Sequence, residues 1–169
     1  MTSAMTIMMR APVNLPDPNV APGVSLGGQL VVAGLLVTVA VIIHGAGIVA
    51  VTRLLKLEDK SLRAHQVNVK AFGLLTSMAL CLFTLHLIEI TVFAGFYLWV
   101  GALHELEPAL FFSTSTYVTL GHPDMGFPDN WRMVAALEGL VGFLMIGWSS
   151  AVFITDMNKV LREDPKTRL

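Results

Sequence analysis

Cysteine and charged residues are both scarce in this chain. Of its 169 residues, 14% are charged, 54% are hydrophobic and one is a cysteine, Cys81. A single cysteine excludes an intrachain disulfide, so we interpret Cys81 as a small packing residue. A mean hydropathy of +0.69 is too high for a soluble domain of this length. We therefore expect a membrane protein in contact with the lipid bilayer. We expect no enzymatic activity and no nucleic-acid partner.

Three stretches with almost no charge are long enough to cross a bilayer. A hydrocarbon core about 30 Å thick requires roughly 20 helical residues at about 1.5 Å each. Residues 24–52 contain no Asp, Glu, Lys or Arg. The only charged residue in 71–103 is Glu89, and the only charged residue in 133–155 is Glu138. The predicted fold class is therefore an all-α membrane protein with three transmembrane helices.

Lys and Arg are unevenly distributed between the two sides of the predicted spans. None occurs in residues 101–131, which connect the second span to the third. The basic residues cluster in the first connection and after the third span, at Arg53, Lys56, Lys60, Arg63, Lys70, Lys159, Arg162, Lys166 and Arg168. Because short loops rich in Lys and Arg remain cytoplasmic, we predict a multi-pass protein of the cell (inner) membrane with loop 56–70 and tail 158–169 in the cytoplasm. The aromatic residues expected at the outer interface are Tyr97, Trp99 and Trp131, with Trp148 nearer the inner one.

Residues 1–23 lack the pattern of a signal peptide, which is a basic segment followed by an apolar run. They contain one basic residue, Arg10, and four prolines, which oppose helix formation. We expect an irregular extracytoplasmic N-terminal tail without an assigned function. Residues 24–55 are expected to form the first transmembrane helix.

The outer connection between the second and third spans contains a segment with the features of a short helix. Glu107-Pro108 precedes eight apolar or hydroxyl-bearing residues, Ala109–Thr116, and proline is favoured in the first turn of a helix. A helix over about residues 105–117 is too short to span, so we expect it to be re-entrant and packed in protein or beside water. Its carboxyl end would direct a negative dipole toward the membrane centre and favour a cation there. The hydroxyls of Ser113–Thr116 could instead serve helix packing.

Residues 117–124, directly after this segment, read Tyr-Val-Thr-Leu-Gly-His-Pro-Asp. Together with the order and membrane sidedness of the flanking elements, they resemble the pore module of the two-transmembrane-type potassium channel superfamily. The resemblance covers about a third of the chain, residues 103–154, and includes Leu137–Gly142 in the following helix. In that family four extended loops, Thr-Val-Gly-Tyr-Gly, surround the pore, and their backbone carbonyls replace the hydration shell of the ion.

The resemblance implies a tetrameric cation channel made of four copies of the chain. It implies a pore module at residues 71–157, with a filter at 118–123 and an inner helix from about residue 131. The permeant ions would be potassium and sodium, and no bound cofactor is expected. The expected filter residues are Val118, Thr119, Leu120, Gly121, His122, Pro123 and Asp124. The first helix has no counterpart in the family's module and is expected to be peripheral.

His122 and Pro123 depart from the family's filter, in which tyrosine and glycine occupy these places. Proline fixes φ near −65° and lacks an N–H, so Pro123 cannot adopt a positive φ. We expect the outer ion sites to be lost or reshaped and potassium selectivity to be weakened. Four copies of His122 near the axis could bind a transition metal or titrate, or each imidazole could brace the filter from behind.

Three glycines and two acids in or next to the third span are candidate pore or gating residues. They are Glu138, Gly139, Gly142, Gly147 and Asp156. The glycines permit either a gating bend or close helix packing. Glu138 lies too deep to be free in lipid and is expected to contact the pore helix or the residues behind the filter, either through a hydrogen bond or by remaining protonated. Asp156 could form an acidic ring at the cytoplasmic mouth or cap the end of the helix.

Ionisable side chains also occur inside the first two spans, at His44, His86 and Glu89. His86 and Glu89 share a face of their helix, and an antiparallel first helix could bring His44 against them. These residues could lock the two helices by a His–Glu hydrogen bond, or form a proton-sensitive or metal-binding site. Two functions besides conduction stay open: a non-conducting channel-fold scaffold or sensor, and a membrane anchor subunit that holds haem between His44 and His86.

Overall fold

The computed structural model describes residues 23–59, 67–121 and 126–162, and all regular structure in these ranges is helical. The elements, in chain order, are α1 (Leu26–Asp59), α2 (Val67–Trp99), α3 (Leu106–Tyr117), the 3-10 turn η1 (Asp129–Trp131) and α4 (Arg132–Arg162). The prediction of an all-α fold is therefore confirmed for the described residues.

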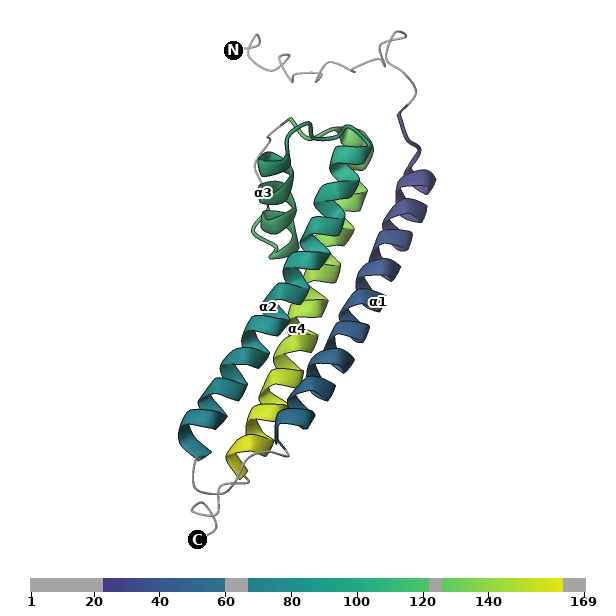
Figure 1. Ribbon diagram of the computed structural model, residues 1–169. Helices are drawn as coiled ribbons and strands as arrows, with labels where there is room; N and C mark the ends of the chain where they lie inside the picture. Colours follow the sequence, from purple (N-terminus) through teal and green to yellow (C-terminus); the bar gives the residue numbers. More distant parts are fainter. Residues whose placement is uncertain (1–22, 60–66, 122–125, 163–169) are drawn as a thin grey trace, which may run out of the picture.

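Three of the helices are long and apolar enough to cross a membrane, and they run side by side (Figure 1). Their candidate spans are Leu26–Leu54 in α1, Phe72–Trp99 in α2, and Asp129–Asn158, which begins in η1 and continues through α4. Large apolar side chains lie on the outer surfaces, among them Leu35 at 63% and Phe72 at 72% exposed. These features support the prediction of a multi-pass membrane protein with three transmembrane helices.

The second span ends at Trp99, earlier than the end predicted at residue 103. Gly101 adopts a positive φ of 68°, and the N–H of Ala102 donates to the carbonyl oxygen of Tyr97 at 2.9 Å. This pattern terminates a helix, because glycine takes the left-handed conformation without steric cost. The apolar residues that follow Trp99 therefore form the turn toward α3.

The short helix α3 begins at the end of the bundle where α2 ends and α4 begins, and it lies against α2 (Figure 1). Its Ser113 hydroxyl donates to the carbonyl oxygen of Ile90 at 2.9 Å. The hydroxyl of Tyr117, the last residue of α3, lies 2.9 Å from Nδ1 of His86, which is at the centre of the Phe72–Trp99 span. α3 is thus antiparallel to α2 and ends level with the middle of that span.

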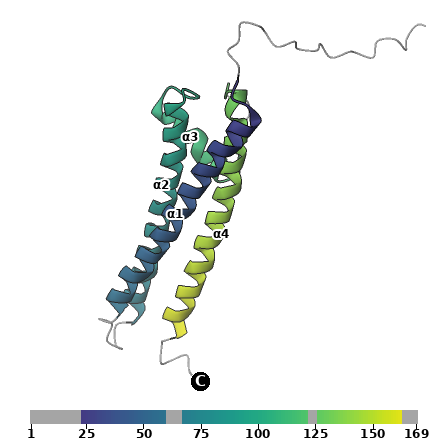
Figure 2. The same ribbon diagram turned by 90° about the vertical axis from the view of Figure 1, so that its right-hand side faces the viewer.

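The helix α1 crosses the bundle, with its start beside α4 and its end beside α2 (Figure 2). At the start, the side-chain carbonyl of Gln29 accepts a hydrogen bond from the backbone N–H of Met133 at 3.2 Å. Near the other end, a Cβ on Gly47 would overlap the side chain of Leu85. α1 therefore packs against both α2 and α4. That α1 lies at the periphery of a pore stays a prediction.

An aromatic core joins the elements at the α3 end of the bundle. The ring of Tyr97 packs edge-on against Phe112, with centroids 5.4 Å apart, and against Phe127, with centroids 5.2 Å apart. Phe112 and Phe127 stack at 4.3 Å. The prediction that Tyr97 lies at the membrane interface is wrong, because its side chain is 0% exposed and faces this core. Trp99, in contrast, is 83% exposed.

Candidate functional site

The carboxyl end of α3 packs closely on α4 because two residues of α4 have no side chain. A Cβ on Gly139 would lie 3.1 Å from the carbonyl oxygen of Thr116, and a Cβ on Gly142 would overlap the carbonyl group and the ring of Tyr117. Gly147, by comparison, has nothing within 4 Å of its Cβ position among the described residues. The geometry favours packing over a hinge as the role of Gly139 and Gly142.

Val118–Gly121 form a capping turn at the end of α3. Their backbone N–H groups donate to the last carbonyls of α3 at 2.9–3.2 Å, and φ is 61° at Thr119 and 68° at Gly121. The turn satisfies carbonyls that a helix end otherwise leaves free. The extended conformation that the family resemblance implies for the filter is therefore wrong for Val118–Gly121 in the single chain. A left-handed threonine is unfavourable by roughly 1–2 kcal/mol, so the surrounding contacts must hold Thr119 in place.

The carbonyl oxygens of the capping turn, Val118–Gly121, accept no hydrogen bond from any residue in the described ranges. The turn borders an open pocket of about 380 Å³ next to α4. The pocket is lined by Thr116, Thr119, Gly121, Ala135, Ala136, Gly139, Leu140 and Phe143. A single chain thus presents backbone oxygens beside α4, level with the middle of the α2 span.

A buried polar network around Glu138 fastens α3 to the two long helices beside it. Glu138 is 0% exposed. Tyr97 of α2 donates its hydroxyl to one carboxyl oxygen at 2.5 Å, and Ser113 of α3 hydrogen-bonds to the other. One of the contacts expected for Glu138, a hydrogen bond to the short helix α3, is therefore present. Because a buried polar group is costly without partners, this network fixes the position of α3 as well as satisfying the carboxyl group.

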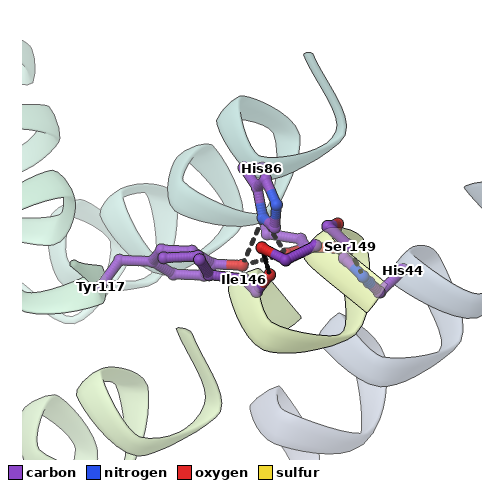
Figure 3. A network of polar contacts seen from close by, with 7 residues as sticks. His44, His86, Tyr117, Ile146 and Ser149 are labelled. Atoms are coloured by element: carbon purple, nitrogen blue, oxygen red, sulfur yellow. Dashed lines mark hydrogen bonds and ion pairs between the residues drawn. The ribbon is translucent and has the colours of Figure 1, made fainter. Parts of the chain in front are cut away.

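A second buried network brings together the ionisable residues of the first two spans (Figure 3). Nδ1 of His44 lies 2.8 Å from one oxygen of Glu89, and both side chains are 0% exposed. Nδ1 of His86, whose side chain is 16% exposed, lies 3.5 Å from the other oxygen. On the far side of His44, the Ser149 hydroxyl lies 3.3 Å from Nε2. The His–Glu hydrogen bond expected between the first two spans is present, and α4 also contacts it through Ser149.

Tyr117 connects this second network to the capping turn. Its hydroxyl donates to Glu89 and lies 2.9 Å from Nδ1 of His86. The turn at Val118 therefore begins at a residue whose side chain is held by α2.

The arrangement does not fit haem between His44 and His86. Bis-histidine ligation requires a macrocycle between the two imidazoles, with one nitrogen of each directed at the iron. Here the ring centroids are 5.3 Å apart, and both Nδ1 atoms face the carboxyl group of Glu89. Tyr117 adds its hydroxyl to the same space. A haem would require α1 and α2 to separate.

Several residues singled out from the sequence lie apart from these networks. His122, Pro123 and Asp124 are outside the described residues, so the outer filter and a metal ring at His122 stay predictions. Asp156 is half-buried near the end of α4, at the opposite end of the bundle from α3 (Figure 1).

Sequence reasoning misses the roles of Tyr97, Tyr117 and Ser149. Tyr97 lies two i, i+4 steps after Glu89 in the sequence, so both side chains lie on the same, inward side of α2. Ser149 lies three helical turns after Glu138, so the two side chains share a face of α4. Burial of Glu138 therefore predicts burial of Ser149, as observed. No comparable local signal identifies Tyr117, because its partners belong to α2.

Comparison with protein families, with curated proteins and with solved structures gave no match to this chain. The potassium-channel resemblance therefore depends on the short motif and on the order of the elements alone.

Proposed function

We propose that the protein is a homotetrameric cation channel of the inner membrane, with the N-terminus outside, the C-terminus in the cytoplasm, and potassium and sodium as permeant ions. In this proposal α3 is a re-entrant pore helix, residues 118–123 form the filter, and α4 lines the pore. The observation that carries the proposal is that the backbone oxygens of Val118–Gly121, at mid-span depth, accept no hydrogen bond from the part of the chain that the structure describes.

Backbone oxygens at that depth require a polar partner. Irregular backbone does not face lipid within the hydrocarbon region, since each unsatisfied group there costs several kcal/mol, and it is tolerated only in protein or beside water. On one chain the capping turn is open, and Leu120 is 80% exposed. A ring of chains around a water-filled path meets both needs, because neighbours cover Leu120 and hydrated cations contact the oxygens.

The charges near this position favour cations over anions. The carboxyl end of α3 carries the negative pole of the helix dipole, and its last residues border the pocket next to α4. On the outer side Glu105 and Glu107 are exposed, and residues 101–131 contain no Lys or Arg. Such an acidic outer face concentrates cations at the entrance. Asp129 contributes less negative charge to this face than Glu105 and Glu107, because it forms an ion pair with Arg132 at 2.9 Å.

Weak selectivity follows from the sequence of the outer filter. Discrimination between potassium and sodium depends on several successive rings of carbonyl ligands. Pro123 cannot adopt the positive φ that a glycine at this place would provide, and His122 replaces the bracing tyrosine. In this proposal the backbone oxygens of the capping turn at Thr119 and Leu120 are therefore the main ion contacts.

Cation flux into liposomes containing the purified protein tests this function. Potassium and sodium gradients are applied separately to the native chain and to Pro123→Gly. We expect comparable fluxes of both ions from the native chain and a several-fold rise in the potassium-to-sodium ratio for Pro123→Gly, because glycine restores the conformation of the outer site. Pro18→Gly, in the N-terminal tail, is the matched control and leaves the ratio unchanged.

Two outcomes contradict the proposal. Flux from Pro123→Gly alone, with none from the native chain over a range of pH and voltage, indicates a channel fold with a non-conducting scaffold or sensor role. No flux from either protein, when both are shown to be folded, removes the pore function altogether.

A further inference from the structure

Three metal-ligating side chains converge between α1 and α2. His44, His86 and Glu89 each offer a ligand atom, and these atoms lie within 4.8 Å of one another. The His–Glu separations of 2.8 Å and 3.5 Å are close to the roughly 3.3 Å between ligands of a tetrahedral zinc ion with bonds of about 2.0–2.2 Å. The hydroxyl of Tyr117, which bonds to Glu89 and His86, provides a fourth donor.

The cluster contains more polar groups than a lock between two helices requires. One His–Glu hydrogen bond is sufficient to join α1 to α2, and His44 with Glu89 already forms it. His86 and Tyr117 then bring further polar groups to the same carboxyl group at membrane depth. Burying such groups is costly, and ionisable residues inside spans usually serve a function. Because His86 and Tyr117 exceed what the helix contact requires, the polar groups around Glu89 indicate a binding site.

A second, independent contact resembles the outer shell of a metal site. Histidines that bind metals usually engage their other ring nitrogen in a hydrogen bond that fixes the ring. Nδ1 of His44 faces the cluster, and Nε2 lies 3.3 Å from the Ser149 hydroxyl. Because a hydroxyl can both donate and accept, Ser149 supports either tautomer of His44. The partly exposed His86, at 16%, gives an ion a route of entry.

We propose that His44, His86 and Glu89 bind a divalent transition-metal ion of the zinc type, with Tyr117 as the fourth ligand. Imidazole nitrogen and carboxylate oxygen are a common donor set for such ions. Binding through Nδ1 leaves the ring proton of each neutral histidine on Nε2, which in His44 faces the Ser149 hydroxyl, and Tyr117 releases its phenol proton to the solvent as its oxygen binds the ion. Rotation of His86 and a small approach of α1 to α2 bring the donors to bonding distance.

The charges of the site suit this ion. Glu89 and an ionised Tyr117 together carry two negative charges, which balance a divalent cation with two neutral imidazoles. A neutral complex is the form that a site within the membrane favours. Binding would also hold the hydroxyl of Tyr117, the residue next to the capping turn.

Titration of the full-length purified protein with Co²⁺ in detergent tests this site without any need for conduction. Co²⁺ substitutes for Zn²⁺ and shows strong visible absorption in tetrahedral sites. We expect one Co²⁺ per chain, displaced by Zn²⁺, and at least tenfold weaker binding in His86→Gln. His104→Gln, at an exposed loop position, and His122→Gln, in the sequence-predicted filter, are matched controls and retain native affinity.

Ser149→Ala provides a second test if His86→Gln does not fold. Loss of an outer-shell contact typically weakens metal binding by about 10–100-fold, whereas Ser150→Ala, at an exposed serine of the same helix, leaves it unchanged. Native protein without the visible band overturns the proposal. So does native affinity in a folded His86→Gln or Ser149→Ala, or loss of binding in His122→Gln alone.

Discussion

Glu138 illustrates how single residues hold this fold together. Its carboxyl group has no exposed surface, and its hydrogen-bond partners are Tyr97 of α2 and Ser113 of α3. The second network repeats the arrangement with Glu89, which bonds to His44 and Tyr117. In both cases an acid on a long helix ties α3 or α1 to the bundle, so these carboxyl groups act as structural junctions.

Ser113→Ala tests the first junction. The substitution removes a hydroxyl that bonds to Glu138 and to the carbonyl oxygen of Ile90, and leaves buried acceptors with one partner fewer. We expect the free energy of unfolding to fall by about 1–3 kcal/mol, the usual cost of an unsatisfied buried polar group. The measurement is the thermal or denaturant midpoint of the purified protein in detergent.

The control for this experiment is Ser150→Ala. Ser150 is exposed, and its hydroxyl donates to the carbonyl oxygen of Ile146 in the same helix, at 2.8 Å. We expect a change within about 0.5 kcal/mol for such a surface substitution. Equal midpoints for Ser113→Ala and the native chain would show that the junction at Glu138 does not stabilise the fold.

At the scale of elements, the contact between α3 and α4 determines where the capping turn lies. α4 has no side chain at Gly139 and Gly142, and the last turn of α3 occupies this space. Phe112, in the middle of α3, packs against Tyr97 in the aromatic core. α3 is therefore held at its middle and at its carboxyl end, which places Thr119–Gly121 beside α4.

Gly142→Ala tests this contact. The new methyl group would overlap the carbonyl group and ring of Tyr117, so α3 must move away from α4. Overpacking of this kind costs about 1–3 kcal/mol, and we expect a lower midpoint of unfolding.

Gly147→Ala is the matched substitution in the same helix. Nothing lies within 4 Å of the added methyl group among the described residues, and alanine is a better helix former than glycine by up to about 1 kcal/mol. We expect an unchanged or higher midpoint. If both variants behaved alike, close packing would not explain Gly142, and the hinge interpretation would regain support.

At the scale of the whole molecule, the proposed tetramer predicts where copies of the chain meet. Leu120 is 80% exposed and lies in the capping turn, next to the proposed axis. In a Cys81→Ser background, which removes the only native thiol, Leu120→Cys should form disulfide-linked dimers upon mild oxidation, because related positions approach one another near a symmetry axis. Denaturing electrophoresis without reductant measures the linked fraction.

Leu35→Cys in the same background is the control. Leu35 is 63% exposed on α1, which the proposal places at the periphery, so little cross-linking is expected there. Efficient linking at Leu35 with none at Leu120 would indicate that the chains associate through α1. That result would contradict a pore formed by the capping turns.

The sequence by itself determined the number of spans and the presence of a short helix before the Thr-Leu-Gly motif. Length and hydropathy are local properties, so runs of apolar residues locate helices without knowledge of their neighbours. The short helix was predicted at 105–117 and is observed at Leu106–Tyr117. The predicted end at residue 103 overran Trp99, since apolar composition does not reveal the left-handed turn at Gly101.

Only the tertiary structure decided which polar groups meet. The sequence left open whether His44 and Glu89 meet, because they are far apart in the chain and their contact depends on how α1 crosses α2. Tyr97 is an interfacial residue by sequence and a core residue in the fold, because α3 and Glu138 cover it. The capping turn likewise follows from backbone hydrogen bonds to the end of α3. Hydropathy thus places residues at a depth in the membrane, whereas packing determines which residues they contact.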